Sequence, residues 1–436
     1  MKYFDDFLRE SQAIIHIPSV QADPIPGKPF GKDVADCLDY VLDLAKKFGF
    51  RTYNNGYYYG YAEIGEGELF GILGHLDVVP FGIGWDYPPT SGAIVDGVMY
   101  GRGVLDDKVP ILSTLFAVKE LVDSGLIPNK RIRIIFGCNE ESGWKCIEKY
   151  VECEEMPVNA FSPDSDFPVN FAEKGVLNYL VSVPMAKDCP LLSIKGGERP
   201  NMVMDSVDAT LRSSEKLVNY LLQNVDSFKM TTAETIDLHF EGVSAHGSTP
   251  ELGKNAFHTL LGIMSAVYGG DWSVLMRKLI PLDGSGVKLD IEDSVSHHLS
   301  MNVGTVNMKG NTLQFSLAIR SPISYKKDYI YDSLRESFPD ATIEETGAHS
   351  PLFVDKDSYL VKNLLEAYNE YAGEVAEPIA IGGATYARAL DNAVAFGPVF
   401  PGRESTIHQK NERVSIDDLK NMYEIYMLAI RKLCFD

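Results

Sequence analysis

Acidic and imidazole side chains recur at five separated places where a short apolar run of the chain ends. They are His75 and Asp77 in GHLDVVP, Asp106 and Asp107 in GRGVLDDK, Glu140 and Glu141 in NEESG, Asp164 in SPDSD, and His408 in STIHQK. In open α/β sheets, sites collect at the carboxyl ends of the strands, which is where these side chains would lie. Carboxylates and neutral imidazoles are ligands that suit zinc or manganese. The pattern therefore indicates the ligand set of a two-metal hydrolase.

Each motif taken alone also has a simpler explanation. His75 and Asp77 share one face of an extended segment, where Asp77 could fix the second ring nitrogen of a ligating histidine or both could belong to a polar turn. The adjacent aspartates of GRGVLDDK precede a helix, whose dipole favours acids even without a metal. Glu140 and Glu141 end a strand that reads as buried, where unpaired charge is costly. One of them could bind metal while its neighbour takes a proton from the attacking water. The joint occurrence of all five segments favours the metal site.

Alternating strand and helix patterns surround these motifs and predict the elements that position them. Helical spacing of apolar residues predicts helices, and β-branched or alternating runs predict strands. Before position 176 we expect helices at 6–17, 33–50 and 109–126 and strands at 59–65, 68–77, 131–141 and 159–169. After position 351 we expect a helix at 358–373, a strand and glycine-rich loop at 375–388, a strand at 392–399 and a closing helix at 415–435 with Ser415 as its N-cap. This alternation predicts a mainly parallel sheet covered on both faces.

The middle of the chain has a different pattern. Segments 176–184, 216–225, 235–248 and 311–320 resemble strands with period-two alternation, mixed with helices. Such a mixture is typical of an α+β domain. We therefore predict an α/β fold whose catalytic domain, residues 1–175 plus 352–436, is interrupted by an inserted α+β lid domain, residues 176–351.

Composition excludes several classes of function. The net charge of -21 disfavours nucleic acid and anionic membrane surfaces, because both require basic patches. No apolar run reaches the roughly 18 residues of a membrane helix, and the start MKYFDDFLRE lacks the features of a signal peptide. The six cysteines form no CxxC pair, which favours reduced thiols in a cytoplasmic protein, with Cys138 as a buried apolar residue.

The ordered set of motifs resembles the M20 family of metallopeptidases, and within it the PepV-type dipeptidases. The matching features are GHLDVVP with the following GW, YGRGxxDDK, NEES, FSPDSDFP, SAHGSTP, the GGATYAR loop and STIHQKNE, and they span nearly the whole chain. The resemblance implies a zinc-peptidase-like catalytic domain with two divalent metal ions, zinc first and manganese or cobalt as alternatives. His75 and Asp164 would hold one ion, Glu141 and His408 the other, and Asp106 would bridge them. Glu140 would be the general base, and Asp77 would orient His75.

The same resemblance implies residues that bind a short peptide substrate. His246 in SAHGSTP is similar to a lid histidine that meets the tetrahedral oxyanion, although a lone histidine in such a turn is usually a surface residue. Asn201 and Arg320 match residues that bind the backbone carboxylate, a task that suits the bidentate guanidinium. The Gly382–Gly383 loop could approach the same carboxylate or form a tight turn. The His297–His298 pair finds no counterpart and lacks acidic neighbours, so we assign it no ligand role.

The expected function is hydrolysis of short peptides with a free N-terminus. Aspartate at position 164 is similar to aminopeptidases and dipeptidases of the family, whereas carboxypeptidase- and desuccinylase-like members tend to carry glutamate. The long lid resembles that of enzymes in which one chain supplies both halves, which predicts a monomer. Alternatives are an N-acyl amino-acid deacylase or carboxypeptidase of the same family, and a catalytically silent peptide-binding protein. One departure from the family pattern is Val109, where glycine is usual and a β-branched residue would crowd the helix start.

Overall fold

A computed structural model describes residues 1–225, 228–373 and 375–436 of the chain. It divides into two compact units. Unit 1 comprises residues 1–171, 354–379 and 385–436, and unit 2 comprises residues 172–353 and 380–384. The expected boundaries at 175 and 352 lie within a few residues of these divisions. The Gly382–Gly383 loop groups with unit 2 and not with the catalytic domain to which we had assigned it.

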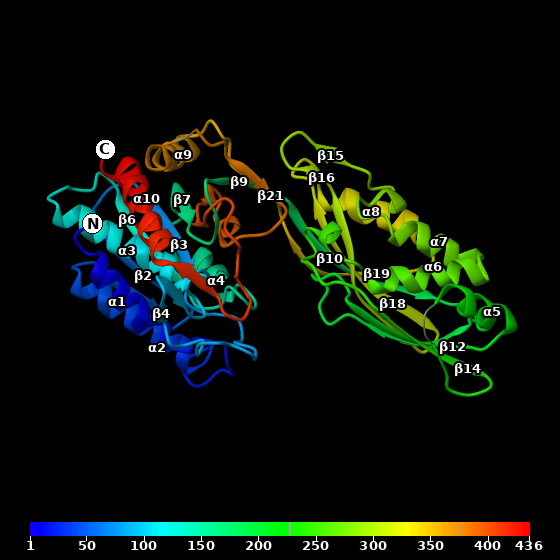
Figure 1. Ribbon diagram of the computed structural model, residues 1–436. Coiled ribbons are helices and arrows are strands. Elements are labelled where there is room, and N and C mark those ends of the chain that lie inside the picture. Colours follow the sequence, from blue (N-terminus) through cyan, green and yellow to red (C-terminus); the bar gives the residue numbers. More distant parts are fainter. Residues whose placement is uncertain (226–227, 374) are drawn as a thin grey trace. The chain divides into compact units, whose positions relative to one another are not determined.

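The sheet of unit 1 has parallel strands at its centre, as expected (Figure 1). Its order is β1-β2-β6-β3-β7-β22, and β22 also pairs with the start of β9. The strands β6, β3, β7 and β22 are parallel to one another, and the β1–β2 hairpin adds antiparallel strands at one edge. The bounds are β1 Arg51–Asn55, β2 Tyr59–Ile64, β3 Leu69–His75, β6 Arg131–Gly137, β7 Asn159–Ser162, β9 Asn170–Glu173 and β22 Ala393–Ala395.

Helices cover both faces of this sheet, as neighbouring residues of β2 show. The absent side chain of Gly60 leaves room for Leu38 of α2, because a Cβ there would lie 2.9 Å from the leucine side chain. The preceding residue, Tyr59, points to the opposite face of the sheet and packs edge-on against Tyr150 of α4. The helices of unit 1 are α1 Phe4–Ile15, α2 Lys32–Lys47, α3 Lys108–Asp123, α4 Lys145–Cys153, α9 Tyr359–Ala372 and α10 Ile416–Cys434. All residues of β3 are buried, which explains why its sequence is continuously apolar.

Short strands and a 3-10 helix complete unit 1. A small antiparallel sheet, β24-β5-β4, joins the loop before α3 to the loop before α10. Strand β8 pairs with β23, and the 3-10 helix η3 follows the glycine-rich loop. The bounds are β4 Ala93–Val95, β5 Val98–Tyr100, β8 Ser165–Asp166, β23 Pro398–Val399, β24 Arg413–Ser415 and η3 Tyr386–Ala389. The β5–β24 pairing brings together two parts of the chain that are more than 300 residues apart.

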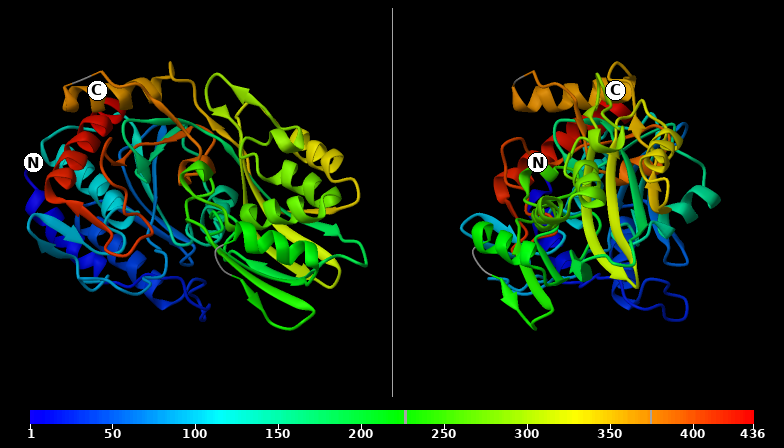
Figure 2. Two further views of the ribbon diagram at one scale, coloured as in Figure 1. Left: turned by 45° about the vertical axis from the view of Figure 1, so that its right-hand side comes forward. Right: turned by 90° about the vertical axis from the view of Figure 1, so that its right-hand side faces the viewer.

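Unit 2 is an α+β fold with its own core. Its antiparallel sheet runs β13-β14-β12-β11-β17-β18-β10-β19, and Figure 2 shows helices gathered along one face of it. Along β12, Val207, Ala209 and Leu211 are buried whereas Ser206 and Asp208 are exposed, so one face of the sheet packs on the helices. The strands are β10 Gly175–Pro184, β11 Leu191–Gly196, β12 Ser206–Arg212, β13 Lys229–Met230, β14 Thr235–Glu241, β17 Ser300–Lys309, β18 Thr312–Ser321 and β19 Thr342–His349.

The remaining elements of unit 2 include one correction. The segment 216–225, expected as a strand, is helical: α5 spans Glu215–Asn224. Its buried residues, Leu217 and Leu221, are four positions apart, as expected for one face of a helix. Ser214 is its N-cap, and the Ser214 side chain accepts from the backbone N–H of Leu217. The other elements are α6 Ala256–Tyr268, α7 Gly270–Leu279, α8 Lys327–Ser337, η1 Pro250–Leu252, η2 Ser285–Val287, β15 Glu292–Asp293, β16 His297–His298, β20 Leu352–Phe353 and β21 Ile379–Ile381, the last two of which pair with β9.

Two smaller expectations from the sequence are confirmed, the N-cap of α10 and the burial of Cys138. Ser415 is the N-cap of α10 and accepts from the backbone N–H of Asp418 at 2.9 Å. Cys138 is fully buried, and all six cysteines are unpaired. Among the residues that the structure describes, no helix has the length and apolar character needed to cross a bilayer.

Candidate metal centre

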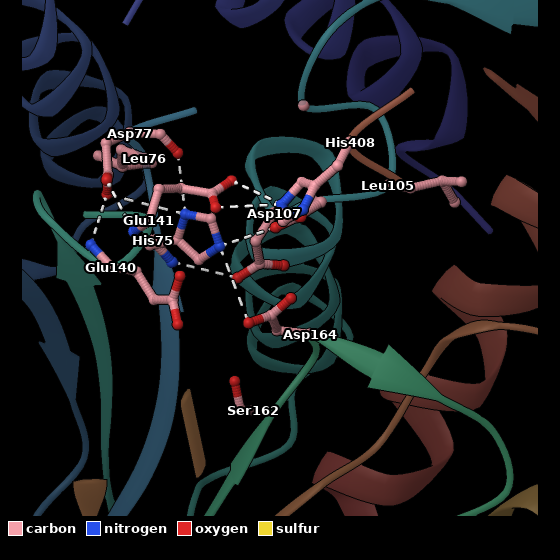
Figure 3. Close-up of polar contacts among 12 residues, drawn as sticks. His75, Leu76, Asp77, Leu105, Asp107, Glu140, Glu141, Ser162, Asp164 and His408 are labelled. Carbon is pink, nitrogen blue, oxygen red and sulfur yellow. Dashed lines mark hydrogen bonds and ion pairs between the residues drawn. The ribbon is translucent and has the colours of Figure 1, made fainter. Parts of the chain in front are cut away.

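The ligand candidates of unit 1 converge at the carboxyl ends of its parallel strands (Figure 3). His75 is the last residue of β3, the Glu140–Glu141 segment follows β6, and Asp164 follows β7. These three strands are neighbours and run in the same direction, so their ends meet at one edge of the sheet. Asp106 lies in the turn before α3, and His408 lies in the loop before β24. The structure thus brings all five predicted metal ligands together.

Asp106 lies between the two imidazoles. Its Oδ1 is 2.9 Å from Nε2 of His75, and its Oδ2 is 2.9 Å from Nε2 of His408. His75 also lies 3.8 Å from Oδ2 of Asp164, and His408 lies 3.1 Å from Oε2 of Glu141. These contacts form two groups that share one carboxylate: His75 with Asp164, and His408 with Glu141.

The donor set fits divalent cations. One ligand atom each of His75, Asp106 and Glu141 lies within 4.8 Å of the others. Nε2 of His75 is fully buried and has no partner of hydrogen-bond geometry among the described residues, although Asp106 is close. Three carboxylates with two imidazoles offer oxygen and nitrogen ligands of the kinds that zinc, manganese and cobalt accept. Bound cations would compensate the negative charge of a buried cluster of this composition.

The pKa shifts of the clustered groups also agree with a site that binds cations. Burial raises the pKa of Asp164 well above its usual range, and the charge of Asp106 adds to the effect. Burial would lower the pKa of His408, but its contacts with Asp106 and Glu141 prevail and raise it to about 11. Burial would also lower the pKa of His75, but the contact with Asp106 and the charge of Asp106 raise that pKa well above its usual value.

Glu140 lies beside the ligand groups and is held by its backbone. Burial raises the pKa of Glu140 to about 8, with Glu141, Asp106 and Asp77 adding to the effect against the influence of His75. The carboxylate of Asp77 accepts from the backbone N–H groups of Glu140 and Glu141, at 3.0 and 3.1 Å. By binding both backbone amides, the Asp77 carboxylate fixes the turn that carries the two glutamates (Figure 3).

The role of Asp77 differs from the one expected. Nδ1 of His75 lies 2.9 Å from the backbone carbonyl of Asp77, while the Asp77 carboxylate is farther away at 3.8 Å. The ring is therefore oriented by a backbone acceptor, and the side chain of Asp77 holds the glutamate turn. Burial raises the pKa of Asp77 to about 6, an effect that His75 opposes.

Two further acids support the site, and neither has a separate role in the prediction from the sequence. Oδ2 of Asp107 accepts from the backbone N–H of His75 at 3.1 Å, which fixes the end of β3. Glu412 is fully buried and accepts from the backbone N–H groups of Gly103 and Leu105 and from the guanidinium of Arg102. Glu412 therefore ties the loop that ends at Asp106 to the loop that carries His408. The Asn-Glu pair in STIHQKNE was the available signal for it.

Val109 does not disturb the start of α3. It is the second residue of the helix, is fully buried and donates its backbone N–H to the carbonyl of Gly103 at 3.1 Å. Its φ is not positive, so the β-branched side chain has an ordinary helical backbone. The departure from the family pattern thus leaves the Asp106 turn formed.

The predicted substrate residues all belong to unit 2, where adjoining segments carry them. Gly247 donates its backbone N–H to the carbonyl of Asn201, which places His246 beside Asn201. Ser300, the register partner of Arg320, donates its hydroxyl to the carbonyl of Ser248. A Cβ on Gly382 would lie 3.5 Å from the side chain of Ser248, so the glycine loop adjoins the same turn. The segments of all four predicted substrate groups therefore meet around the turn that contains His246.

His246 has a defined arrangement within that turn. Its Nδ1 accepts from the backbone N–H of Ser248 at 3.3 Å and lies 2.6 Å from the hydroxyl of the same residue. With Nδ1 as an acceptor, the neutral ring carries its proton on Nε2, which is then a donor. The His297–His298 pair lies on a surface hairpin, where His298 pairs with Glu292.

Comparisons with known proteins agree with this geometry. A sequence model of "Peptidase family M20/M25/M40" matches residues 71–432. The chain is 37% identical over 451 residues to "Putative dipeptidase YtjP" of Bacillus subtilis (strain 168), covering 98% of this chain and 97% of the relative. It is 33% identical to a "Putative dipeptidase" of Staphylococcus epidermidis, covering 100% and 98% of the two chains.

Solved structures share the fold at low sequence identity. Human carnosine dipeptidase 1 superposes with a TM-score of 0.62 at 14% identity, covering 99% of this chain and 96% of that one. The dipeptidase Dug1p from Saccharomyces cerevisiae superposes with a TM-score of 0.59 at 16% identity, with the same coverage of 99% and 96%. These similarities establish the fold, a mostly parallel α/β unit with an inserted lid.

Proposed function

Because the chain belongs to peptidase family M20/M25/M40, we propose that it is a dipeptidase that uses two divalent metal ions to hydrolyse short peptides with a free N-terminus. The observation that carries the proposal is the position of Asp106, whose two oxygens each face one imidazole. His75, Asp106 and Asp164 would hold one ion, and His408, Asp106 and Glu141 the other. Zinc is the first candidate, with manganese or cobalt as alternatives. Metal ions so placed lower the pKa of water and polarise a carbonyl.

The residues of the chain would then perform the proton transfers. Glu140 would take a proton from the attacking water and later deliver it to the leaving amine, as a general base and then acid. Asp77 would keep Glu140 in place through the two backbone amides described above. His246 would donate from Nε2 to the oxyanion that develops on the scissile carbonyl, a contact typically worth about 3–4 kcal/mol.

Unit 2 would also supply recognition of the substrate. Arg320 and Asn201 would bind the terminal carboxylate of the peptide, assisted by the backbone N–H groups of Gly382 and Gly383. A guanidinium suits this task because its two parallel N–H groups match a carboxylate. Their common position around the His246 turn supports one shared substrate site. We propose that the active species is a cytoplasmic monomer, which native mass measurement and cell fractionation can test.

A panel of free dipeptides and their N-acylated counterparts, assayed with each metal ion, tests the proposal. We expect cleavage of the free dipeptides, and Glu140→Ala should retain metal but lose turnover by about 10²–10⁴-fold. Preference for the blocked substrates would instead support an N-acyl amino-acid deacylase or carboxypeptidase. Binding of peptides without any cleavage by the metal-loaded protein would support a silent binding protein. Full activity of Glu140→Ala would remove Glu140 as the base.

A further inference from the structure

Trp144 occupies a fixed position at the end of the glutamate turn. It is the N-cap residue of α4 and has a left-handed backbone with a φ of 61°. Its backbone N–H donates to the carbonyl of Asn139 at 2.8 Å, and the side-chain oxygen of Asn139 accepts from the N–H of Lys145 at 3.1 Å. Asn139 therefore closes the loop that begins with Glu140 and ends with Trp144.

The indole of Trp144 contacts the carboxylate of Glu140 directly. Nε1 of the indole donates to Oε1 of Glu140 at 3.1 Å. Asp77 holds the backbone of the same glutamate, so Glu140 is fixed at two levels, by its amide and by one carboxylate oxygen. An indole N–H can only donate and does not titrate, so its role toward Glu140 is orientation and not proton transfer.

Aromatic packing fixes the indole itself. The ring of Trp144 packs edge-on against Tyr386, with centroids 5.7 Å apart, and Tyr386 packs edge-on against the ring of His75 at 6.1 Å. Tyr386 is fully buried, and its hydroxyl lies 3.0 Å from Sγ of Cys146. Gly137 makes room for it, because a Cβ there would lie 2.1 Å from the hydroxyl oxygen. The indole is thus supported by a ring that also supports a metal ligand.

We propose that Trp144 is a positioning residue that holds the Glu140 carboxylate in its productive orientation. Oε1 is engaged by the indole, which assigns Oε2 to the attacking water. A glutamate has three rotatable side-chain bonds, and fixing them before reaction removes an entropic part of the barrier. This inference rests on the proposed role of Glu140 as the base.

The test is Trp144→Phe, which keeps a ring against Tyr386 and deletes the N–H donor. We expect kcat to fall about tenfold or more, because a hydrogen bond to a charged group is lost. KM and the metal content should not change, since the role inferred for Trp144 is confined to the Glu140 carboxylate. The matched control is Trp272→Phe, which makes the same substitution at a buried tryptophan of α7 in the core of unit 2. The control should keep its kcat.

A double-mutant cycle with Glu140→Asp separates positioning from packing. Aspartate retains a carboxylate but withdraws it from the indole by one methylene, so Trp144→Phe should cause little further loss in that background. An equal loss of kcat in both backgrounds, or a change confined to KM or metal content, would overturn the inference. Full activity of Glu140→Ala would instead overturn the proposed base, independently of Trp144.

A spectroscopic measurement covers the case in which Trp144→Phe does not fold. The near-ultraviolet circular dichroism of the indoles is compared between the wild-type protein and Glu140→Ala. A changed indole band in Glu140→Ala supports the contact, and identical spectra overturn it.

Discussion

At the scale of single residues, the site depends on carboxylates that each perform two tasks. Asp106 presents one oxygen to His75 and the other to His408, and Asp77 accepts from the amides of Glu140 and Glu141. Burial would favour the neutral acid at Asp106, but its contacts with the two imidazoles lower its pKa below the usual range. Each oxygen of the Asp106 carboxylate therefore faces one imidazole, which is the geometry that the proposed bridging role needs.

Replacing Asp106 with Asn tests this double role. The amide keeps one oxygen but loses the charge and one of the two acceptors, so we expect the metal content to fall at both positions and activity to be lost. Elemental analysis of the purified protein and a dipeptide assay measure the two effects. Asp123→Asn, which changes an exposed acid at the end of the neighbouring helix α3, should leave both unchanged. Full metal content in Asp106→Asn would contradict the bridging role.

The convergence of the proposed ligands was easier to predict from the sequence than the groups that support them. His75, Asp106, Glu141, Asp164 and His408 are recognisable because residue type and strand-end position both signal them. The partners of Asp77 and Trp144 could not be predicted in this way, since each depends on the turn geometry of residues 139–144. A side chain that binds a backbone amide leaves no pattern of residue types to detect.

At the scale of elements, a buried ion pair fixes the two loops that meet at the metal centre. Glu412 and Arg102 are both almost fully buried, and their closest atoms are 2.7 Å apart. Arg102 also lies over the ring of Trp85, with its guanidinium carbon 5.3 Å from the centroid. The carboxylate satisfies two amides of the loop before Asp106 as well. The position of Asp106 relative to His408 thus depends on Glu412.

Glu412→Gln should destabilise the protein by about 3 kcal/mol, because it leaves the buried guanidinium without a counter-charge. Metal affinity should fall as well, since the two ligand loops lose their common anchor. Urea unfolding and metal titration measure these quantities. Asp6→Asn breaks the exposed pair with Arg9, which should cost at most about 1 kcal/mol, and serves as the control. Equal effects of the two substitutions would contradict the anchoring role.

Helix α6 carries a group that makes unit 2 sensitive to acid. Burial lowers the pKa of His258 to about 4, opposed by a hydrogen bond to the backbone of Leu279, whereas an unfolded histidine titrates near 6.5. Between these values the unfolded chain binds a proton that the folded unit does not. The free energy of unfolding of unit 2 should therefore fall as pH decreases through this window.

His258→Gln checks the sign of this effect. The variant lacks the titrating group, so its urea midpoint should fall less than that of the wild-type protein between about pH 7 and about pH 5. A parallel decrease in the two proteins would show that His258 does not contribute.

The prediction of secondary structure succeeded for elements with a long periodic pattern and failed for an element whose pattern was short. The helices α3 and α10 and the buried strand β3 are long enough for one pattern to dominate. Helix α5 was mistaken for a strand, because Leu217, Val218, Tyr220 and Leu221 in a ten-residue helix are compatible with either period. The serine cap at Ser214 was the signal that distinguished the two.

At the scale of the whole molecule, the chain forms two units with separate cores, and the inserted arrangement was predictable from the change of pattern near residue 176. Strands that alternate with helices produce the parallel sheet of unit 1, and longer alternating strands produce the antiparallel sheet of unit 2. The exact division was not predictable, since residues 380–384 lie within a late α/β segment of the sequence but group with unit 2. Their place depends on contacts such as that between Gly382 and Ser248.

This division predicts that removing metal weakens one unit and not the other. All five proposed ligands belong to unit 1, and a ligand that binds only the folded state stabilises the part of the protein that it contacts. With a chelator present, amide hydrogen exchange should therefore accelerate in β3, β6 and the start of α3. Exchange in β10, β18 and α6 of unit 2 should stay as it was, because these elements have their own core.

The measurement is hydrogen exchange followed by mass spectrometry of peptides from both units, before and after adding back zinc. Equal acceleration in the two units would mean that the bound metal stabilises the protein as one cooperative body, contrary to this expectation.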